Sequence, residues 1–258
     1  METPIRAVTA RLRDARRVTV LTGAGVSAAS GVPTFRGADG LWRRYQAADL
    51  ATPDAFARDP ALVWEWYAWR RETIAACRPN RAHAVLASWT GRHPDWRVIT
   101  QNVDDLHVRA GTRNLIRLHG SLWMLSCAAR CPGVPRSWSD DRVPLPGPLP
   151  RCCHCGALAR PAVVWFGESL DPADVQKATD ATVCDVFIAA GTSAVVYPAA
   201  GLLDLARSRG AFTVEINVDA TAATPRVDAA IRGPVEAVLA EIEADLCPPL
   251  ERDHRVLD

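Results

Sequence analysis

Five of the 8 cysteines in this 258-residue chain lie close together in its middle. Four of them form two short-spaced pairs, about twenty residues apart: Cys127 with Cys131, and Cys152 with Cys155. Pairs of this kind, in a chain that starts without a secretory signal, favour a metal site over disulfides. Four thiolates complete a tetrahedral Zn²⁺ shell and leave no place for water, so we expect one structural zinc. Two alternatives stay open: Cys153 or His154 replaces Cys152, or the cluster is reduced and metal-free.

His119 follows the apolar run Leu115–Leu118, which predicts a short strand. A histidine at the end of a strand can exchange a proton near neutral pH. The residues alone favour a hydrogen-bonded structural histidine, with proton transfer as the alternative.

Tyr67 and Arg70 are three residues apart in a segment that predicts a helix, with Asp59 as its N-cap and Pro60 in the first helical position. Residues at this spacing share one helix face. A phenol beside a guanidinium makes a receptor for a carboxylate, because the arginine offers a planar fork and the tyrosine adds one O–H. The alternative is that the aromatic face only packs against the rest of the molecule.

Several apolar runs that predict strands end in small or polar residues. Val18–Thr22 leads into Gly23-Ala24-Gly25, a turn typical of dinucleotide binding, although an ordinary tight turn also fits. Gln101 to Asp104 follow the second run, Arg97–Thr100. Gly191 to Ser193 follow a third, and Asn217 ends a fourth. Since open α/β sheets bind ligands at the carboxyl ends of their strands, we expect these residues to surround a nucleotide.

The stretch GAGVSAASGVPTFRG, residues 23–37, resembles the cofactor loop of the sirtuins, the NAD-dependent protein-lysine deacylases. TQNVDDLH (100–107), LHG (118–120) and RPAVVWFGE (160–168) match further sirtuin motifs. EWYAWRRE (65–72) is similar to a helix of the subgroup that prefers succinyl- and malonyl-lysine. The resemblance extends from about Val18 to Val235, nearly the whole chain.

This resemblance implies an α/β fold with a Rossmann-like parallel sheet domain and a smaller module. We assign residues 1–37, 80–122 and 160–250 to the NAD-binding domain. Residues 38–79 would form a helical insertion and residues 123–159 a zinc ribbon, which together make up the smaller module. NAD and an extended acyl-lysine peptide would meet between the two parts.

The resemblance also assigns roles to individual residues. It makes His119 the general base and places Asn102 beside the nicotinamide as a second catalytic residue. It implies that Tyr67 and Arg70 read the acyl carboxylate, while Val163, Trp165 and Phe166 line the acyl-lysine channel in a segment that pairs with the substrate backbone as an added strand. The NAD-binding residues would be Gly23, Ala24, Gly25, Ser27, Thr34, Phe35, Arg36, Trp42, Gln101, Asn102, Val103, Asp104, Gly191, Thr192, Ser193, Asn217, Val218, Asp219 and Val235.

In the reaction that the resemblance implies, NAD is consumed and not recycled. Nicotinamide leaves, the acyl oxygen attacks the ribose carbon, and His119 takes a proton from a ribose hydroxyl. The products would be nicotinamide, O-acyl-ADP-ribose and free lysine. The alternatives are a deacetylase without preference for acyl carboxylates, a non-catalytic zinc-bearing NAD or ADP-ribose binder, and a conventional NAD(P) oxidoreductase.

The net charge of +1 argues against nucleic acid or a membrane surface as a partner. The longest uncharged run, Val186 to Leu203, contains Gly191 and Pro198, which favour strand, loop and helix over a membrane span. We therefore expect a cytoplasmic protein that acts on other proteins.

Overall fold

The computed structural model describes residues 3–33, 47–133, 135–145, 147–193 and 197–247. Its helices are α1 (Pro4–Asp14), η1 (Ala24–Ser30), α2 (Ala47–Leu50), α3 (Pro53–Arg58), α4 (Pro60–Ala76), α5 (Arg81–Arg92), α6 (Leu106–Arg109), α7 (Pro172–Ala181), α8 (Ala199–Ser208), η2 (Thr224–Arg226) and α9 (Val235–Leu246). Its strands are β1 (Val18–Thr22), β2 (Arg97–Thr100), β3 (Leu115–Arg117), β4 (Gly120–Cys127), β5 (Ser137–Ser139), β6 (Ala159–Val163), β7 (Val186–Ala190), β8 (Phe212–Asn217) and β9 (Ala229–Arg232).

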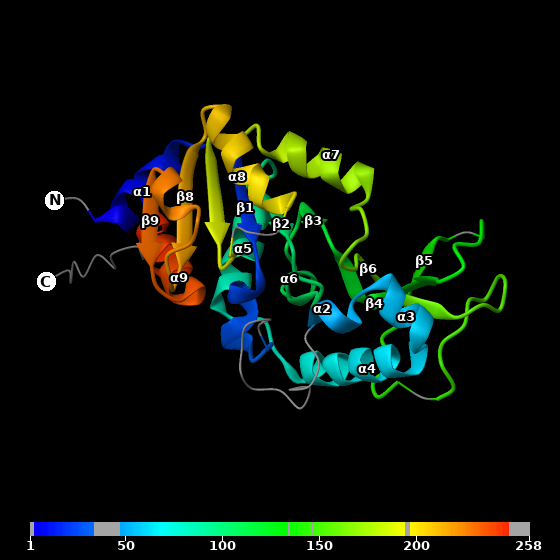
Figure 1. Ribbon diagram of the computed structural model, residues 1–258. Helices are drawn as coiled ribbons and strands as arrows, with labels where there is room; N and C mark the ends of the chain where they lie inside the picture. Colours follow the sequence, from blue (N-terminus) through cyan, green and yellow to red (C-terminus); the bar gives the residue numbers. More distant parts are fainter. Residues whose placement is uncertain (1–2, 34–46, 134, 146, 194–196, 248–258) are drawn as a thin grey trace, which may run out of the picture.

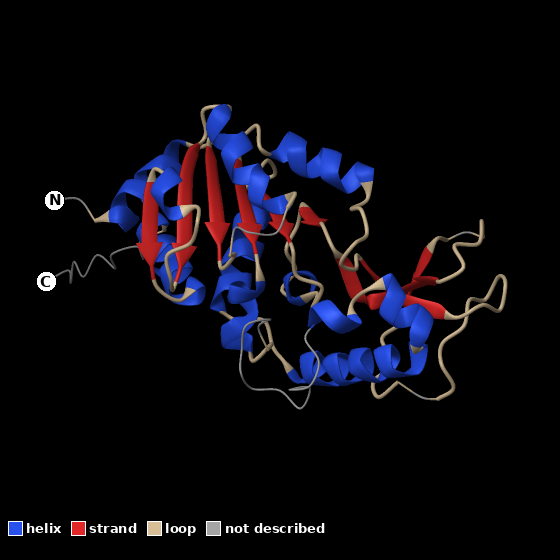
Figure 2. Ribbon diagram, viewed as in Figure 1, coloured by secondary structure: helices blue, strands red, loops and turns tan. Residues whose placement is uncertain are grey.

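The larger sheet of the described residues has six parallel strands in the order β3-β2-β1-β7-β8-β9. Numbered among themselves, these strands run 3-2-1-4-5-6, the order of a Rossmann sheet. The chain reverses its direction of travel across the sheet between β1 and β7, where a ligand crevice is expected. The predicted α/β class is therefore confirmed (Figure 2).

Helices cover both faces of this sheet, which explains why its central strands are buried along their whole length. β1 and β7 are buried at every position. Val20 and its neighbours on one face pack with α1, α5 and α9, whereas Leu21 and its neighbours on the other pack with α7 and α8 (Figure 1). Alternate residues of each strand thus enter separate cores.

The smaller module consists of an antiparallel sheet in the order β5-β4-β6, with α2, α3 and α4 packed beside it (Figure 1). Asp59 caps α4 as predicted, because its side chain accepts a hydrogen bond from the Leu62 N–H at 3.0 Å. Polar bonds from the buried side of α4 reach the sheet: Trp64 Nε1 donates to the Ala159 carbonyl at 3.0 Å, and Arg71 Nε to the Leu122 carbonyl at 2.8 Å.

The assigned division of the chain into domains stays a prediction, but two of its boundaries fall inside strands. The boundary at residues 122–123 falls inside β4, and that at 159–160 falls inside β6. Both strands belong to the smaller sheet, where Gly120 pairs with Val163 and Ser126 with Arg160, so these parts of the chain are not in the Rossmann-like sheet. Within the described residues, no helix has the length and apolar character needed to cross a bilayer.

Candidate active site

A cavity of about 920 Å³ has walls from both sheets. On the side of the larger sheet it is lined by residues that directly follow β1, β2 and β7: Gly23, Ala24, Gln101, Asn102, Val103, Asp104, Thr192 and Ser193. On the other side it is lined by Tyr67 and Arg70 of α4 and by Val163, Trp165 and Phe166 at the end of β6. His119 lies between β3 and β4 and also lines the cavity. The structure thus brings both predicted catalytic residues, part of the predicted NAD set and all five predicted substrate residues into one cavity.

The glycine turn after β1 packs tightly on the loop after β7. The Gly25 N–H donates to the Gly191 carbonyl at 2.9 Å, and a Cβ on Gly25 would lie only 2.7 Å from the Gly191 Cα. Gly191 itself has φ +60°, a conformation that favours glycine. Gly25 and Gly191 therefore shape the nucleotide edge by close backbone contact, and neither lines the cavity. The helix that follows the turn is a 3₁₀ helix, η1.

Asn102, Ser27 and Asp104 form a connected polar group at the ends of β1 and β2. Asn102 Nδ2 donates to the Gly23 carbonyl and to Ser27 Oγ, both at 3.1 Å, and Ser27 Oγ donates to Asp104 Oδ2 at 2.8 Å. Burial raises the pKa of the Asp104 carboxyl, while bonds from the Leu106 N–H and the Ser27 hydroxyl oppose that rise. Ser27 is fully buried and outside the cavity lining, so in this structure it holds Asn102 and Asp104 in place.

His119 has one ring nitrogen fixed by the backbone. Its Nδ1 lies 2.8 Å from the carbonyl oxygen of Gln101. Because a carbonyl oxygen only accepts, Nδ1 must carry the proton, which leaves Nε2 as a proton acceptor. Burial lowers the pKa of His119 below its ordinary 6.5, so the ring is neutral at pH 7. The side chain is therefore set up as a base.

Two further histidines are buried behind the site, where His83 and His107 have ring centroids 4.8 Å apart. His107 Nε2 lies 3.1 Å from Thr22 Oγ1, and His83 Nε2 lies 3.4 Å from Ser27 Oγ. Burial lowers the pKa of His83 to about 4 and that of His107 to about 3.

These two shifts predict a loss of stability in mild acid. Below pH 6.5 both histidines are protonated in the unfolded chain, whereas in the folded protein they stay neutral because their pKa values are lower. The free energy of unfolding should thus fall by up to about 1.4 kcal/mol per pH unit for each histidine, until their folded values are reached. Urea unfolding at pH 7.0 and 5.5 measures this, and His83→Gln should reduce the slope. Equal stability at both pH values would contradict the prediction.

Tyr67 and Arg70 stand on one face of α4, as their spacing predicts. The Tyr67 hydroxyl is buried and accepts a hydrogen bond from Trp165 Nε1 at 2.8 Å. Burial raises the pKa of Tyr67 to about 12, so the hydroxyl keeps its proton. The half-buried Arg70 guanidinium lies 4.9 Å from the ring centroid of Trp66 and 5.8 Å from that of Tyr67.

The segment after β6 is held by its own backbone. The N–H groups of Val164 and Phe166 donate to the carbonyls of His119 and Ala51 at 3.0 and 2.9 Å, and the Trp165 N–H donates to the Glu168 carboxylate at 2.9 Å. Because these three donors are satisfied, an added strand would pair with carbonyl groups here or with residues on either side.

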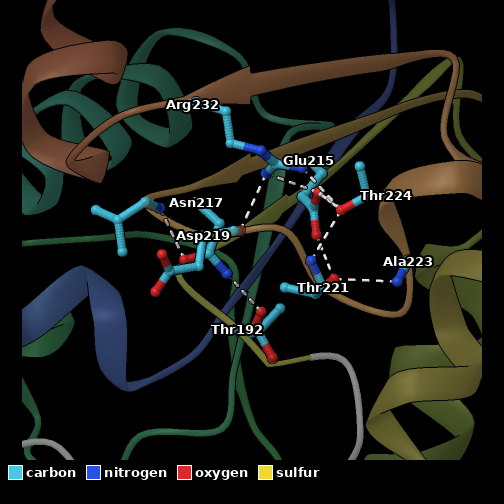
Figure 3. A network of polar contacts seen from close by, with 9 residues as sticks. Thr192, Glu215, Asn217, Asp219, Thr221, Ala223, Thr224 and Arg232 are labelled. Carbon is cyan, nitrogen blue, oxygen red and sulfur yellow. Dashed lines mark hydrogen bonds and ion pairs between the residues drawn. The ribbon is translucent and has the colours of Figure 1, made fainter.

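Of the residues near β8 and α9 that are predicted to bind NAD, Asn217 is bonded to the cavity wall. Asn217 Nδ2 donates to the Thr192 carbonyl at 2.9 Å, and Thr192 lines the cavity wall (Figure 3). Val218 and Asp219 are exposed at the end of β8, while Val235 is buried in the core. Their predicted contacts with NAD stay predictions. Thr34, Phe35, Arg36 and Trp42 lie outside the described residues.

The sulfur atoms of Cys127, Cys131, Cys152 and Cys155 all lie within 4.8 Å of one another. The Sγ–Sγ distances are 3.5 Å between Cys127 and Cys155 and 3.7 Å between Cys131 and Cys152. A tetrahedral zinc shell with bonds of about 2.3 Å places its sulfurs about 3.8 Å apart, so these four ligands fit Zn²⁺.

Neither open alternative for the fourth ligand agrees with this geometry. Cys153 is exposed and lies outside the cluster, and the His154 ring packs where a Cβ on Gly133 would stand.

The sequence model of the Sir2 family matches residues 23–198. The chain belongs to the Sir2 family. NAD-dependent protein deacylase 1 of Archaeoglobus fulgidus is 48% identical over 232 residues, which cover 90% of this chain and 93% of that protein. The mitochondrial NAD-dependent protein deacylase sirtuin-5 of Canis lupus familiaris is 45% identical over 251 residues, 88% of this chain and 81% of that protein.

Solved Sir2 structures agree in fold. A complex of a Sir2 homologue mutant with ADP-ribose superposes with a TM-score of 0.87 at 46% identity, covering 95% of this chain and 96% of that one. A Sir2 complex with a p53 peptide and NAD⁺ has a TM-score of 0.80 at 26% identity, with coverage of 95% and 98%.

Sequence reasoning missed part of the cavity of this Sir2-family protein. Gly167 to Leu170, with Pro172, Val175 and Gln176 of α7, form one wall, and Tyr197 stands at its edge with 74% of its surface exposed. The sequence of α7 is typical of an ordinary amphipathic helix and contains no motif that indicates a ligand site. The sequence signal that could have found part of this wall is the motif RPAVVWFGE (160–168), whose last two residues, Gly167 and Glu168, line the cavity.

Zinc should be needed for the smaller module of this Sir2-family protein to stay folded, because β5 is the only strand or helix among the described residues between Cys127 and Cys155. Cys152→Ser, which removes one ligand, should lower Tm by roughly 5 °C or more, since each lost kcal/mol shifts Tm of a chain this size by about 2–4 °C. Metal content by mass spectrometry and near-UV circular dichroism test this, with the exposed Cys153→Ser as the matched control. If wild-type protein stripped of metal kept the Tm of the metal-bound protein, the prediction would be contradicted.

Proposed function

We propose that this protein uses NAD to remove acyl groups that end in a carboxylate, succinyl and malonyl above all, from lysine side chains of other proteins. NAD-dependent protein deacylation is the activity that its relatives are named for. The observation that carries the acyl preference is the position of Tyr67 and Arg70 in the cavity wall across from the nucleotide edge.

These two side chains suit a carboxylate better than a methyl group. The Tyr67 hydroxyl accepts a bond from Trp165 Nε1 and keeps its own proton, which it can donate to a carboxylate oxygen. The Arg70 guanidinium is held over the Trp66 ring, which orients its planar fork. An anionic acyl end between them would form charge-assisted hydrogen bonds, whereas an acetyl methyl would fill the same volume without using either group.

The nucleotide side supplies the groups that a deacylation needs. NAD, when bound, provides the ADP-ribose that receives the acyl group. His119 Nε2 accepts a proton from a ribose hydroxyl, and the Nδ1 bond to the Gln101 carbonyl fixes the ring for that transfer. Asn102 and Asp104 hold the nicotinamide end, and Ser27 keeps both in position.

The acylated protein would bind as an extended segment along the smaller sheet. β6 is an edge strand of that sheet in the described residues, and it leads directly into Val163, Trp165 and Phe166 of the cavity wall. An edge strand with apolar residues at the mouth of a cavity is suited to a peptide whose modified lysine enters the cavity. The Sir2 complex with a p53 peptide supports this choice of ligand.

One assay tests the proposal. Purified protein and NAD are mixed with three peptides that differ only in an acetyl-, malonyl- or succinyl-lysine, and nicotinamide release is followed. We expect kcat/KM for the succinyl and malonyl peptides to exceed that for the acetyl peptide by tenfold or more. The unmodified peptide is the control. Equal values for all three peptides would contradict the acyl preference, and no release from any of them would contradict deacylation.

A further inference from the structure

Glu215 is a buried carboxylate in β8, with only 2% of its surface exposed, two residues before the strand ends at Asn217. Both of its oxygens are bonded (Figure 3). Thr221 Oγ1 donates to Oε1. Oε2 accepts from Thr224 Oγ1 at 2.6 Å and pairs with Arg232 Nη1 at 2.9 Å. We call Glu215, Thr221, Thr224 and Arg232 the Glu215 cluster.

The cluster folds the segment after β8 back onto the strand end. Arg232 Nη1 also donates to the Asp219 carbonyl at 3.1 Å, and its Nη2 to Thr224 Oγ1 at 2.8 Å. Thr224 Oγ1 in turn accepts from the Thr221 N–H at 2.8 Å. The bonds therefore join one carboxylate, one guanidinium and the segment 219–224, and they fix the position of the Asp219 carbonyl after the strand end.

The end of β8 is connected to the cavity by two further bonds. Asn217 Nδ2 donates to the Thr192 carbonyl at 2.9 Å (Figure 3), and Gln101 Nε2 donates to Thr192 Oγ1 at 2.9 Å. The carbonyl of Gln101 is the group that holds His119 Nδ1. Glu215 lies two residues before Asn217 on the same strand, and from Asn217 these hydrogen bonds run through Thr192 and Gln101 to the proposed base.

A buried carboxylate paired with arginine is not needed for stability alone, since apolar residues of similar volume stabilise a core at least as well. What the pair provides is a fixed geometry for the segment that it joins. Here that segment carries the exposed Asp219 at the carboxyl end of a Rossmann strand, the edge at which nucleotides bind.

We infer that Glu215, with Arg232, is a positioning residue for the nucleotide. It holds the end of β8 and the segment 219–224 in the shape that binds the ADP-ribose part of NAD. This inference rests on the proposed function, because it requires that NAD bind at this edge.

Glu215→Gln tests the inference. Glutamine keeps the shape of the side chain, but only one of its two terminal atoms is an acceptor, because the amide nitrogen donates. It therefore cannot accept the bonds from Thr221, Thr224 and Arg232 together. We expect Kd for ADP-ribose, measured by isothermal titration calorimetry, and KM for NAD to rise about tenfold. The kcat and the KM for the acyl peptide should stay within about twofold of wild type.

Asp228→Asn is the matched control. Asp228 Oδ2 accepts from the N–H and the hydroxyl of Thr213, both at 2.7 Å, at the opposite end of β8. This variant should lose a comparable amount of thermal stability and bind ADP-ribose like wild type. Thr224→Val is a second, milder change within the cluster, which should raise Kd in the same direction.

Unchanged Kd for ADP-ribose in Glu215→Gln and Thr224→Val, with a lowered Tm, would overturn the inference and leave the proposed function intact. An equal rise of Kd in Asp228→Asn would also overturn it, because any weakening of β8 would then have the same effect. If wild-type protein bound no ADP-ribose, the proposed function itself would be contradicted.

Discussion

Replacing His119 with alanine should lower kcat/KM for deacylation by about 10²- to 10⁴-fold while Kd for NAD stays within a few-fold of wild type. The reason is the asymmetric setting of the ring. The Gln101 carbonyl, 2.8 Å away, fixes the proton on Nδ1 and leaves Nε2 as the acceptor. Alanine removes that acceptor, but it removes none of the bonds among Gly23, Asn102 and Ser27 that shape the nucleotide edge.

The pH profile separates a base from a structural histidine. Burial lowers the pKa of His119 below 6.5, so wild-type kcat/KM should stay level from pH 8 to 7 and fall only at lower pH, as the ring gains a proton. In His119→Ala the residual rate should lack this acid limb. His93→Ala, at an exposed histidine, is the control and should behave like wild type. An unchanged rate in His119→Ala would remove His119 from the mechanism.

The strand ends could be predicted because each one is a local change in the sequence. A buried parallel strand is an apolar run, and Val18–Thr22 or Arg97–Thr100 stops where Gly23 or Gln101 begins. Parallel strands in one sheet bring such ends to one edge, so the meeting of Asn102, His119 and Thr192 followed from topology.

What could not be predicted depends on contacts between distant parts of the chain. The apolar run Ala162–Phe166 would look the same in either sheet, and only the pairing of β6 with β4 places its start in the smaller module. Gly25 fits a ligand turn by sequence, but its neighbour is Gly191, far along the chain. The same holds for α7, which lines the cavity through Pro172, Val175 and Gln176, although no local motif marks these residues.

The double variant Tyr67→Phe with Arg70→Met should separate the two acyl classes. Losing the partners of a desolvated charge costs about 2–5 kcal/mol, or roughly 30- to 5,000-fold in kcat/KM for the succinyl peptide. The acetyl peptide has no charge to leave unpaired, so its kcat/KM should change by about threefold or less. The ratio of the two values is therefore the measured quantity.

If Tyr67 and Arg70 served only in packing, the double variant would lose activity equally on both peptides, and the ratio of the two kcat/KM values would not change. Phenylalanine removes the acceptor of the buried Trp165 N–H, and that cost falls on the folded protein whichever peptide is bound. Arg71→Met is the matched control, because Arg71 is the next residue on α4, is buried, and pairs with Asp140 at 3.4 Å in place of facing the cavity. It should lower stability and leave the ratio unchanged. Equal losses on both peptides in the double variant would show that Tyr67 and Arg70 only pack, and the smaller module would then have no part in reading the acyl end.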